Sequence, residues 1–472
     1  MAQKNKKTDR AERKEGGKNT TLRSKICRKS VLLPSVFGCL AVILWVFCVY
    51  DWPQLYRIED PYKVSYDGRI TFNLTHSHLP ETEAEIVQIV RDANNQGRKI
   101  RVLASGHSWS EIAQTQDIMI SLGRYKGKVS FDPATMEYTV KAGTRLAELN
   151  ELLDKDHVAM INLGSVTGQT IAGAISTATH GTGHGFTNLA ALVTKLKFVS
   201  GSGEVMTVDN SDERFRALQP EYRLSEVRSG HTLDECINEL DTLSKGERVK
   251  YWVDFHNNVC NVFNTSKTTE EPFGFMCSVV SNIIYYAFAV VTRITYLVPS
   301  LTTPLMKLVS LTLMTPTHRV AKSYEILTDF FRLPIHQESE VVVELKDTAE
   351  LIRTIRDVVI NGHFPVNYVT EVRFVKGDDA WLSPHYGSDK IFCAVTLTIY
   401  APEKTSSAYF DAVYTNATRK FNGRVHWGKY FTSGPTEIRA MLPRFDDFAD
   451  VRLKLDPNGV FMNDALKKAF GF

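Results

Sequence analysis

Residues 158–185, VAMINLGSVTGQTIAGAISTATHGTGHG, are dense in glycine, serine, threonine and alanine and have few charges. Small residues leave backbone N–H groups accessible, so a backbone of this kind can approach a ligand closely. A flexible Gly/Ser loop is the alternative interpretation. Apolar residues at 161, 166, 171 and 175 favour packing against a core. We therefore expect this segment to form a folded wall beside a ligand.

The positive charge of the chain is concentrated at its N-terminus. The formal net charge is +3, but residues 1–30 alone carry +8, which leaves −5 for the rest. A basic tail on an acidic body argues against nucleic-acid binding by the folded part. We expect residues 1–30 to be a cytoplasmic tail, because lysine and arginine mark the cytoplasmic side of a membrane segment.

The tail is followed by residues 31–50, twenty residues without a charge, which is close to the length of a bilayer-spanning helix. The run is too long for the apolar core of a typical cleaved signal peptide. It predicts an uncleaved transmembrane signal anchor with the body in the lumen; a buried core helix is the alternative. Three glycosylation triplets, starting at Asn73, Asn264 and Asn416, then fall in the lumenal part. We expect a glycoprotein.

The seven cysteines show neither metal-ligand nor CxxC spacing, and we expect no metal site. Cys236, Cys260, Cys277 and Cys393 belong to the predicted lumenal body, and the sequence leaves their pairing open. His180 and His184 have no carboxylate or cysteine between them, which argues against a metal there.

The body begins with an alternation of helices and strands. Thr82 and Glu85 form a capping-box pattern ahead of an apolar helical face, and Gly97 predicts the end of that helix. Strands are expected in DIMISL, GKVSFD and EYTVKAG, a helix in RLAELNELLDKD, and a hairpin over 195–209. This order is typical of an α/β layer.

A second domain of helices and strands is expected from residue 221. Within it, residues 273–291 lack any charge, and after Arg293 a second apolar stretch reaches Met314. A membrane-facing helical patch and a buried helical pair both fit this composition.

The segment RVLASGHSWS, residues 101–110, passes from an apolar run into glycine, histidine and serines. Its consecutive N–H groups are suited to a pyrophosphate, yet it lacks the Walker and Rossmann glycine patterns. Taken alone, His107 is most simply a solvated loop side chain.

Six motifs in order give the chain a family resemblance: RVLASGHSWS, VKAGTRLAEL, NLGSVTGQTIAGAISTATHGTG, TEVRFVKGDDAWLSP, GRVHWGKY and LDPNGVFMNDAL. From about residue 65 to the C-terminus the chain resembles the sugar-1,4-lactone oxidases, which are flavoproteins of the vanillyl-alcohol-oxidase type. The resemblance implies an α+β fold with a PCMH-type FAD-binding domain over 65–220 and a substrate domain over 221–472. The C-terminal segment would return to the flavin.

The resemblance also implies the cofactor and its contacts. His107 matches the histidine that is bonded covalently to FAD in covalent members, and its neutral imidazole is a competent nucleophile. The other implied flavin contacts lie in two small-residue segments: Ser105, Gly106, Ser108, Gly164, Ser165, Thr170, Gly173, Ser176, Thr177, His180 and Gly181.

Four further residues match the catalytic motifs of related enzymes. Glu371 would position substrate hydroxyls, Arg373 would contact the substrate and the flavin edge, and Lys429 would support the reacting oxygen or the flavin charge. His426 is a second candidate there. A fixed cation and an oriented donor set suit hydride transfer to a flavin. An ordinary strand ion pair is the alternative for Glu371 and Arg373.

The function implied is oxidation of an aldono-1,4-lactone, first of all L-gulono-1,4-lactone to ascorbate, by oxygen with hydrogen peroxide as co-product. Oxidation of D-arabinono-1,4-lactone and dehydrogenation with another acceptor are alternatives. Location in the endoplasmic reticulum membrane is expected, without an obligate protein partner. After residue 218 one strand-turn-strand unit of the family pattern is lacking. An inactive, flavin-poor membrane interaction protein is therefore the alternative of another class.

Overall fold

The computed structural model describes residues 64–72, 75–209, 218–272, 276–313, 316–328 and 335–471. All of them belong to one compact unit, Gln54–Phe472. The predicted tail and anchor, residues 1–50, lie outside the described residues. Among the helices that are described, none combines the length and the apolar character needed to cross a bilayer.

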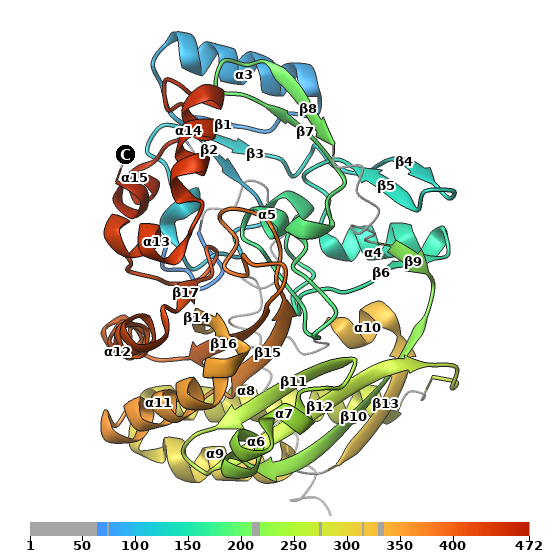
Figure 1. Cartoon of the computed structure of the whole chain (residues 1–472), viewed down its shortest axis with the longest axis vertical. Helices are drawn as coiled ribbons and strands as arrows, with labels where there is room; N and C mark the ends of the chain where they lie inside the picture. Colours follow the sequence, from blue (N-terminus) through green and yellow to red (C-terminus); the bar gives the residue numbers. More distant parts are fainter. Residues whose placement is uncertain are drawn as a thin grey trace, which may run out of the picture. The chain divides into compact units, whose positions relative to one another are not determined.

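The first half of this unit surrounds a small parallel sheet (Figure 1). Thr82 caps helix α3 by accepting a hydrogen bond from the N–H of Glu85, and Gly97 follows the helix with φ +65°. Both features were predicted. The three strands lie in the order β1-β3-β2. Their bounds, with that of the helix, are β1 Ser77–His78, α3 Glu83–Asn95, β2 Ile100–Leu103 and β3 Ile118–Ser121.

Three antiparallel strand pairs and four short helices complete the described part of this half. The expected strands, the helix after them and the hairpin are all present, so these predictions are confirmed. The elements are η1 Glu111–Ala113, β4 Lys128–Asp132, β5 Glu137–Val140, α4 Leu146–Lys155, β6 Val158–Met160, α5 Ile171–Ser176, η2 Ala190–Leu192, β7 Lys195–Val199, β8 Val205–Asp209 and β9 Leu218–Pro220. Strand β9, which begins where the sequence predicts that a family unit is lacking, pairs with β6.

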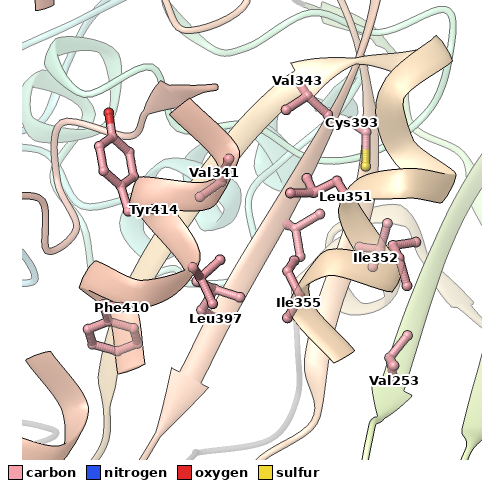
Figure 2. Packing of buried hydrophobic residues seen from close by; sticks show 14 of the residues in the cluster. Val253, Val341, Val343, Leu351, Ile352, Ile355, Cys393, Leu397, Phe410 and Tyr414 are labelled. Carbon is pink, nitrogen blue, oxygen red and sulfur yellow. The ribbon is translucent and has the colours of Figure 1, made fainter. Parts of the chain in front are cut away.

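The second half is built on an eight-stranded antiparallel sheet, in the order β13-β10-β12-β11-β15-β16-β14-β17. Helices α11 and α12 pack on it through apolar side chains, among them Leu351, Ile355 and Phe410, which meet Val341 and Leu397 of the sheet (Figure 2). The strands are β10 Arg223–Thr232, β11 Arg248–Asp254, β12 Val259–Thr268, β13 Thr317–Lys322, β14 Gln337–Glu344, β15 Thr370–Lys376, β16 Ile391–Ile399 and β17 Arg424–Val425.

Helices occur throughout the sequence of this half, between and after its strands. They are α6 Leu233–Asn238, α7 Leu240–Leu243, α8 Met276–Leu297, η4 Pro299–Leu301, α9 Thr302–Leu313, α10 Ser323–Leu327, η5 Leu345–Asp347, α11 Thr348–Asn361, α12 Glu403–Phe421, α13 Pro435–Met441, α14 Phe445–Leu455 and α15 Asp464–Phe470. A disulfide between Cys236 and Cys260 joins α6 to β12.

The C-terminal helices lie beside the first half of the unit, red against blue in Figure 1. The N–H of Ile100 donates to the carbonyl of Val460 over 2.7 Å. The N–H of Gly201 donates to the carbonyl of Leu455 over 2.8 Å. Contacts between residues more than 200 apart therefore hold the two halves together around the space between them.

Candidate functional site

A cavity of about 710 Å³ lies between the small-residue segments of the first half and the large sheet of the second. Its size is within the usual range of cofactor and ligand sites, about 300–1,000 Å³. One wall is formed by residues 101–109, a second by residues 164–180, and the sheet end by strands β14, β15 and β16 with residues 426–429.

The loop after β2 presents His107 to this cavity. Gly106 has φ +68°, a left-handed conformation that glycine adopts without steric cost, and its carbonyl accepts a hydrogen bond from the N–H of Tyr66. The Tyr66 ring stacks on the His107 ring at a centroid distance of 5.4 Å. Further along, the N–H of Trp109 donates to the carbonyl of Gly428 over 2.9 Å. The loop is thus fixed on both sides of His107.

The His107 ring is packed closely against the second wall. A Cβ placed on Gly168 would lie 2.5 Å from Nε2 of His107. Burial lowers the pKa of His107 to about 4, and the Arg145 cation adds to this effect. The imidazole is therefore neutral at physiological pH, which is the nucleophilic form.

Strand register brings the polar residues at the sheet end together. Glu371 of β15 pairs with Thr396 of β16, which in turn pairs with Glu340 of β14. Trp252 of β11 is the partner of Glu371 on its other side, and its indole N–H donates to the Glu371 carboxylate over 3.3 Å. Residues paired directly across a sheet project to the same face, so this row of polar side chains faces the cavity together.

Arg373 connects this row to the second wall. Two residues along β15 from Glu371, it forms an ion pair with that carboxylate and donates to the hydroxyl of Ser165. It also donates to the carbonyl of His180 over 3.2 Å. Arg373 is 9% exposed, so its guanidinium is positioned by contacts with both halves of the unit and not by solvent.

Lys429 lies between two carboxylates. Its Nζ is 3.0 Å from Oε2 of Glu338 and 2.9 Å from Oε2 of Glu340, and it donates to the hydroxyl of Thr396 over 3.2 Å. Burial alone would raise the pKa of Glu338, but the Lys429 charge and His336 outweigh it and lower that pKa to about 2. The pKa of Glu340 is likewise held well below its usual range by Lys429 and His180, against the effect of burial.

The two histidines here have different hydrogen-bonding roles. His180 has an oxygen beside each ring nitrogen, the carbonyl of Gly181 at 2.9 Å from Nδ1 and Oε1 of Glu340 at 3.0 Å from Nε2. Nδ1 of His426 accepts from the N–H of Gly428 over 3.1 Å. Burial lowers the pKa of His426 to about 4. Its neutral ring therefore carries the hydrogen on Nε2, as a donor.

The residues along the cavity suit FAD. Backbone of Ser105 and Gly106 borders the cavity without a bulky side chain, and the α5 segment approaches it so closely that a Cβ on Gly173 would lie 3.1 Å from that of Ala104. Within the described part of the chain, the buried Oε1 of Gln169, which also lines the cavity, has no hydrogen-bond partner. A ligand with hydrogen-bond donors would satisfy it.

Most residues singled out from the sequence meet at this cavity. Those that line it are Ser105, Gly106, His107, Ser108, Gly164, Ser165, Gly173, Ser176, Thr177, His180, Glu371, Arg373, His426 and Lys429. Thr170 instead caps α5, where its hydroxyl accepts from the N–H of Gly173, and Gly181 permits close packing, since a Cβ there would lie 2.4 Å from Asn162. Their individual roles toward a flavin stay predictions.

Sequence reasoning missed the acidic side of the site. Glu338 and Glu340 contact Lys429, and His336, with its Nε2 2.9 Å from Glu338, lines the same cavity. A signal was present in QESEVVVE, residues 337–344, because glutamates at alternate positions of a strand, Glu338 and Glu340, share one face. Among the described residues, the site included, no group of three potential ligands is arranged to hold a metal ion.

Family models match the chain in two parts. The model described as "FAD binding domain" matches residues 77–209, and the one described as "D-arabinono-1,4-lactone oxidase" matches residues 215–469, more than half of the chain. The chain belongs to the sugar-lactone oxidase family. It is accordingly an FAD-dependent oxidoreductase, as the motifs implied.

Individual relatives agree with this membership. The chain is 28% identical to the L-gulono-1,4-lactone dehydrogenase of Mycobacterium tuberculosis, with 83% of this chain and 95% of the relative covered. It is 29% identical to the L-gulonolactone oxidase of Scyliorhinus torazame, over 83% and 94%. Among solved structures, cholesterol oxidase from B. sterolicum matches with a TM-score of 0.69 at 16% identity, covering 86% of this chain and 96% of that one. At that identity the match shows the α+β fold alone.

Proposed function

We propose that this sugar-lactone oxidase oxidises an aldono-1,4-lactone, L-gulono-1,4-lactone before D-arabinono-1,4-lactone, and that oxygen is reduced to hydrogen peroxide. The observation that carries the proposal is the polar row of β14, β15 and β16 directly across one cavity from the His107 loop. FAD, when bound, supplies the two-electron acceptor and passes the electrons to oxygen.

The chain's own residues orient the substrate. Glu371 and Arg373 are fixed to each other and offer an acceptor and a donor for adjacent hydroxyls of a sugar ring. Lys429 and the Nε2–H of His426 are hydrogen-bond donors that would hold the oxygen of the hydroxyl group being oxidised.

Charge balance at the sheet end favours a neutral substrate. Three carboxylates, Glu338, Glu340 and Glu371, are paired with three cations, Lys429, Arg373 and Lys250. A buried cation already neutralised by a carboxylate has little attraction left for another anion. A closed lactone therefore fits better than its hydrolysed, anionic aldonate.

We propose further that FAD is attached covalently to His107. The support is the neutral imidazole, held by Tyr66 and by close packing against Gly168. The purified chain is expected to be yellow, with flavin fluorescence that survives a denaturing gel. His107→Ala is expected to abolish this fluorescence; persistence on the gel would contradict the attachment.

The same measurements separate the alternatives. A panel of lactones with peroxide detection identifies the substrate, and turnover only with an artificial electron acceptor would show a dehydrogenase instead of an oxidase. A flavin-loaded protein that turns over no lactone would refute the proposed reaction. A colourless protein would favour the flavin-poor interaction protein.

The proposed location is the endoplasmic reticulum membrane, with residues 31–50 as the anchor and the body in the lumen. The Cys236–Cys260 disulfide supports an oxidising compartment. Asn264 is exposed on β12 and accessible for glycosylation, Asn416 is half-buried on α12, and Asn73 lies outside the described residues. A glycosidase-sensitive mass shift in protease-protected microsomes is expected; a protease-accessible body would contradict this topology.

A further inference from the structure

The loop and helix ends where α8 meets α9 expose a cluster of large apolar side chains. Leu297 is 72% exposed and Leu308 59%, and the cluster is completed by Ile294, Val298 and Leu301. We call these five residues the apolar corner. Single exposed apolar residues are ordinary, but a group of neighbours marks an interaction surface.

The inner side of the same helices explains why these residues face outward. Thr292, Thr295 and Ser310 are buried on the protein side. The amide of Asn367 donates to the Thr295 hydroxyl over 2.9 Å, and the Ser310 hydroxyl donates to Asp254. Polar contacts therefore fix the orientation of both helices, and the leucines are left on the outside.

The segment that carries the corner has basic charges only. The sequence contains no aspartate or glutamate from residue 272 to 324, and residues 294–306 contain no charged residue at all. Lys307 is exposed beside the corner. Apolar side chains flanked by basic ones and free of acidic ones are typical of surfaces that enter the interface of a lipid bilayer.

The short connection between residues 31–50 and the body also favours a lipid bilayer as the binding partner of the apolar corner. The uncharged run 31–50 ends only thirteen residues before Val64, where the described body begins. At about 3.5 Å per residue, this connection spans at most roughly 45 Å. If residues 31–50 cross a membrane, the beginning of the body at Val64 lies within that distance of its surface.

We propose that the apolar corner inserts shallowly into the lumenal leaflet as a second membrane attachment, in addition to the proposed anchor, on whose membrane location it rests. The attachment also bears on the site. The Phe288 ring of α8 packs edge-on against the Tyr368 ring, with 4.9 Å between the ring centroids. The Tyr368 ring lies in turn 5.3 Å from the ring of His336, which lines the cavity. The corner thus belongs to helices that support the cavity wall.

The test uses the full chain in phosphatidylcholine vesicles containing a phosphatidylcholine with a photoactivatable acyl chain. After illumination, labelled peptides are mapped by mass spectrometry. Label is expected in residues 31–50 and in residues 294–308, and not in α14, where Val451 and Leu453 are exposed apolar residues outside the corner. The triple variant Leu297→Ser/Leu301→Ser/Leu308→Ser is expected to lose the corner label and to keep the anchor label. The control Val451→Ser/Leu453→Ser is expected to change neither.

The outcomes separate this inference from the proposed location. Label in 31–50 with none in 294–308 overturns the corner alone and fits a corner covered by a second copy of the chain. Label in 294–308 with none in 31–50 supports the corner and refutes the anchor. Label in neither segment overturns both. Equal label in 294–308 and in α14 would show non-specific contact and also overturns the inference.

Discussion

At the scale of single residues, Gly168 fixes the place of the His107 ring. A methyl group at this position would lie 2.5 Å from Nε2, and the atom that must move is the end of a side chain and not backbone. Gly168→Ala is therefore expected to leave the fold intact but to displace the imidazole, with loss of most gel-stable flavin fluorescence. Gly185→Ala, where nothing lies within 4 Å, is the matched control. Full fluorescence in Gly168→Ala would show that the attachment tolerates a moved ring.

His426 gives the stability of the protein a defined pH dependence. Its folded pKa of about 4 lies below the ordinary histidine pKa of 6.5, so the unfolded chain takes up a proton first as the pH falls. The free energy of unfolding should thus fall between pH 6.5 and 4, by about 3 kcal/mol for this group. His426→Asn retains an acceptor for the Gly428 N–H and should show a shallower fall in denaturant titrations over this range. Parallel curves for both proteins would contradict a buried neutral His426.

At the scale of elements, the disulfide between α6 and β12 closes a loop across 24 positions of sequence. Loop closure of this length stabilises a fold by about 3 kcal/mol through the unfolded state. Cys236→Ala/Cys260→Ala should lower the free energy of unfolding by about that amount, and dithiothreitol should destabilise the wild type but not the variant. A wild type insensitive to reductant under unfolding conditions would argue that the bond contributes nothing.

Local elements were predictable because their signals are local. Residues within a few positions of one another determine three of these elements: the cap at Thr82, the helix end at Gly97 and the turn of the 195–209 hairpin. The apolar region 273–314 left two alternatives open. Among its described side chains, α8 and α9 bury threonines and expose leucines, which differs from a fully buried helical pair, and the membrane-facing patch stays a prediction. Hydrophobicity alone does not specify the direction of a face whose inner contacts are polar.

The site was predictable only in part. His107, Arg373 and Lys429 were found through motifs, which record spacing along the chain. The pairing of Glu371 with Thr396 and of Thr396 with Glu340 depends on strand register between segments far apart in sequence, which no single motif contains. The acidic partners of Lys429 therefore became visible only in the folded sheet.

At the scale of the whole described body, the C-terminal segment connects the two halves. The amide of Asn463 donates to three carbonyls of the η1 segment, those of Glu111 at 3.1 Å, Ile112 at 3.2 Å and Gln114 at 2.7 Å. Oδ1 of the same residue accepts from the N–H of Leu466 and caps α15. One side chain thus starts the last helix and holds it against the segment that follows the His107 loop.

The two roles of Asn463 can be separated by substitution. Aspartate keeps the capping oxygen but cannot donate, so Asn463→Asp leaves three carbonyls without their donor and places a carboxylate against them. We expect a loss of about 2–3 kcal/mol in the free energy of unfolding and a lower flavin content, because buried acceptors lose their partner. Asn463→Ser, a good N-cap, should also lose the contact to η1.

The control is Asn458→Ala, which removes an exposed side-chain hydrogen bond to Asn94. It should lower the free energy of unfolding by less than about 0.5 kcal/mol. If Asn463→Asp and Asn458→Ala unfold at the same denaturant concentration, the C-terminal contact does not hold the two halves together.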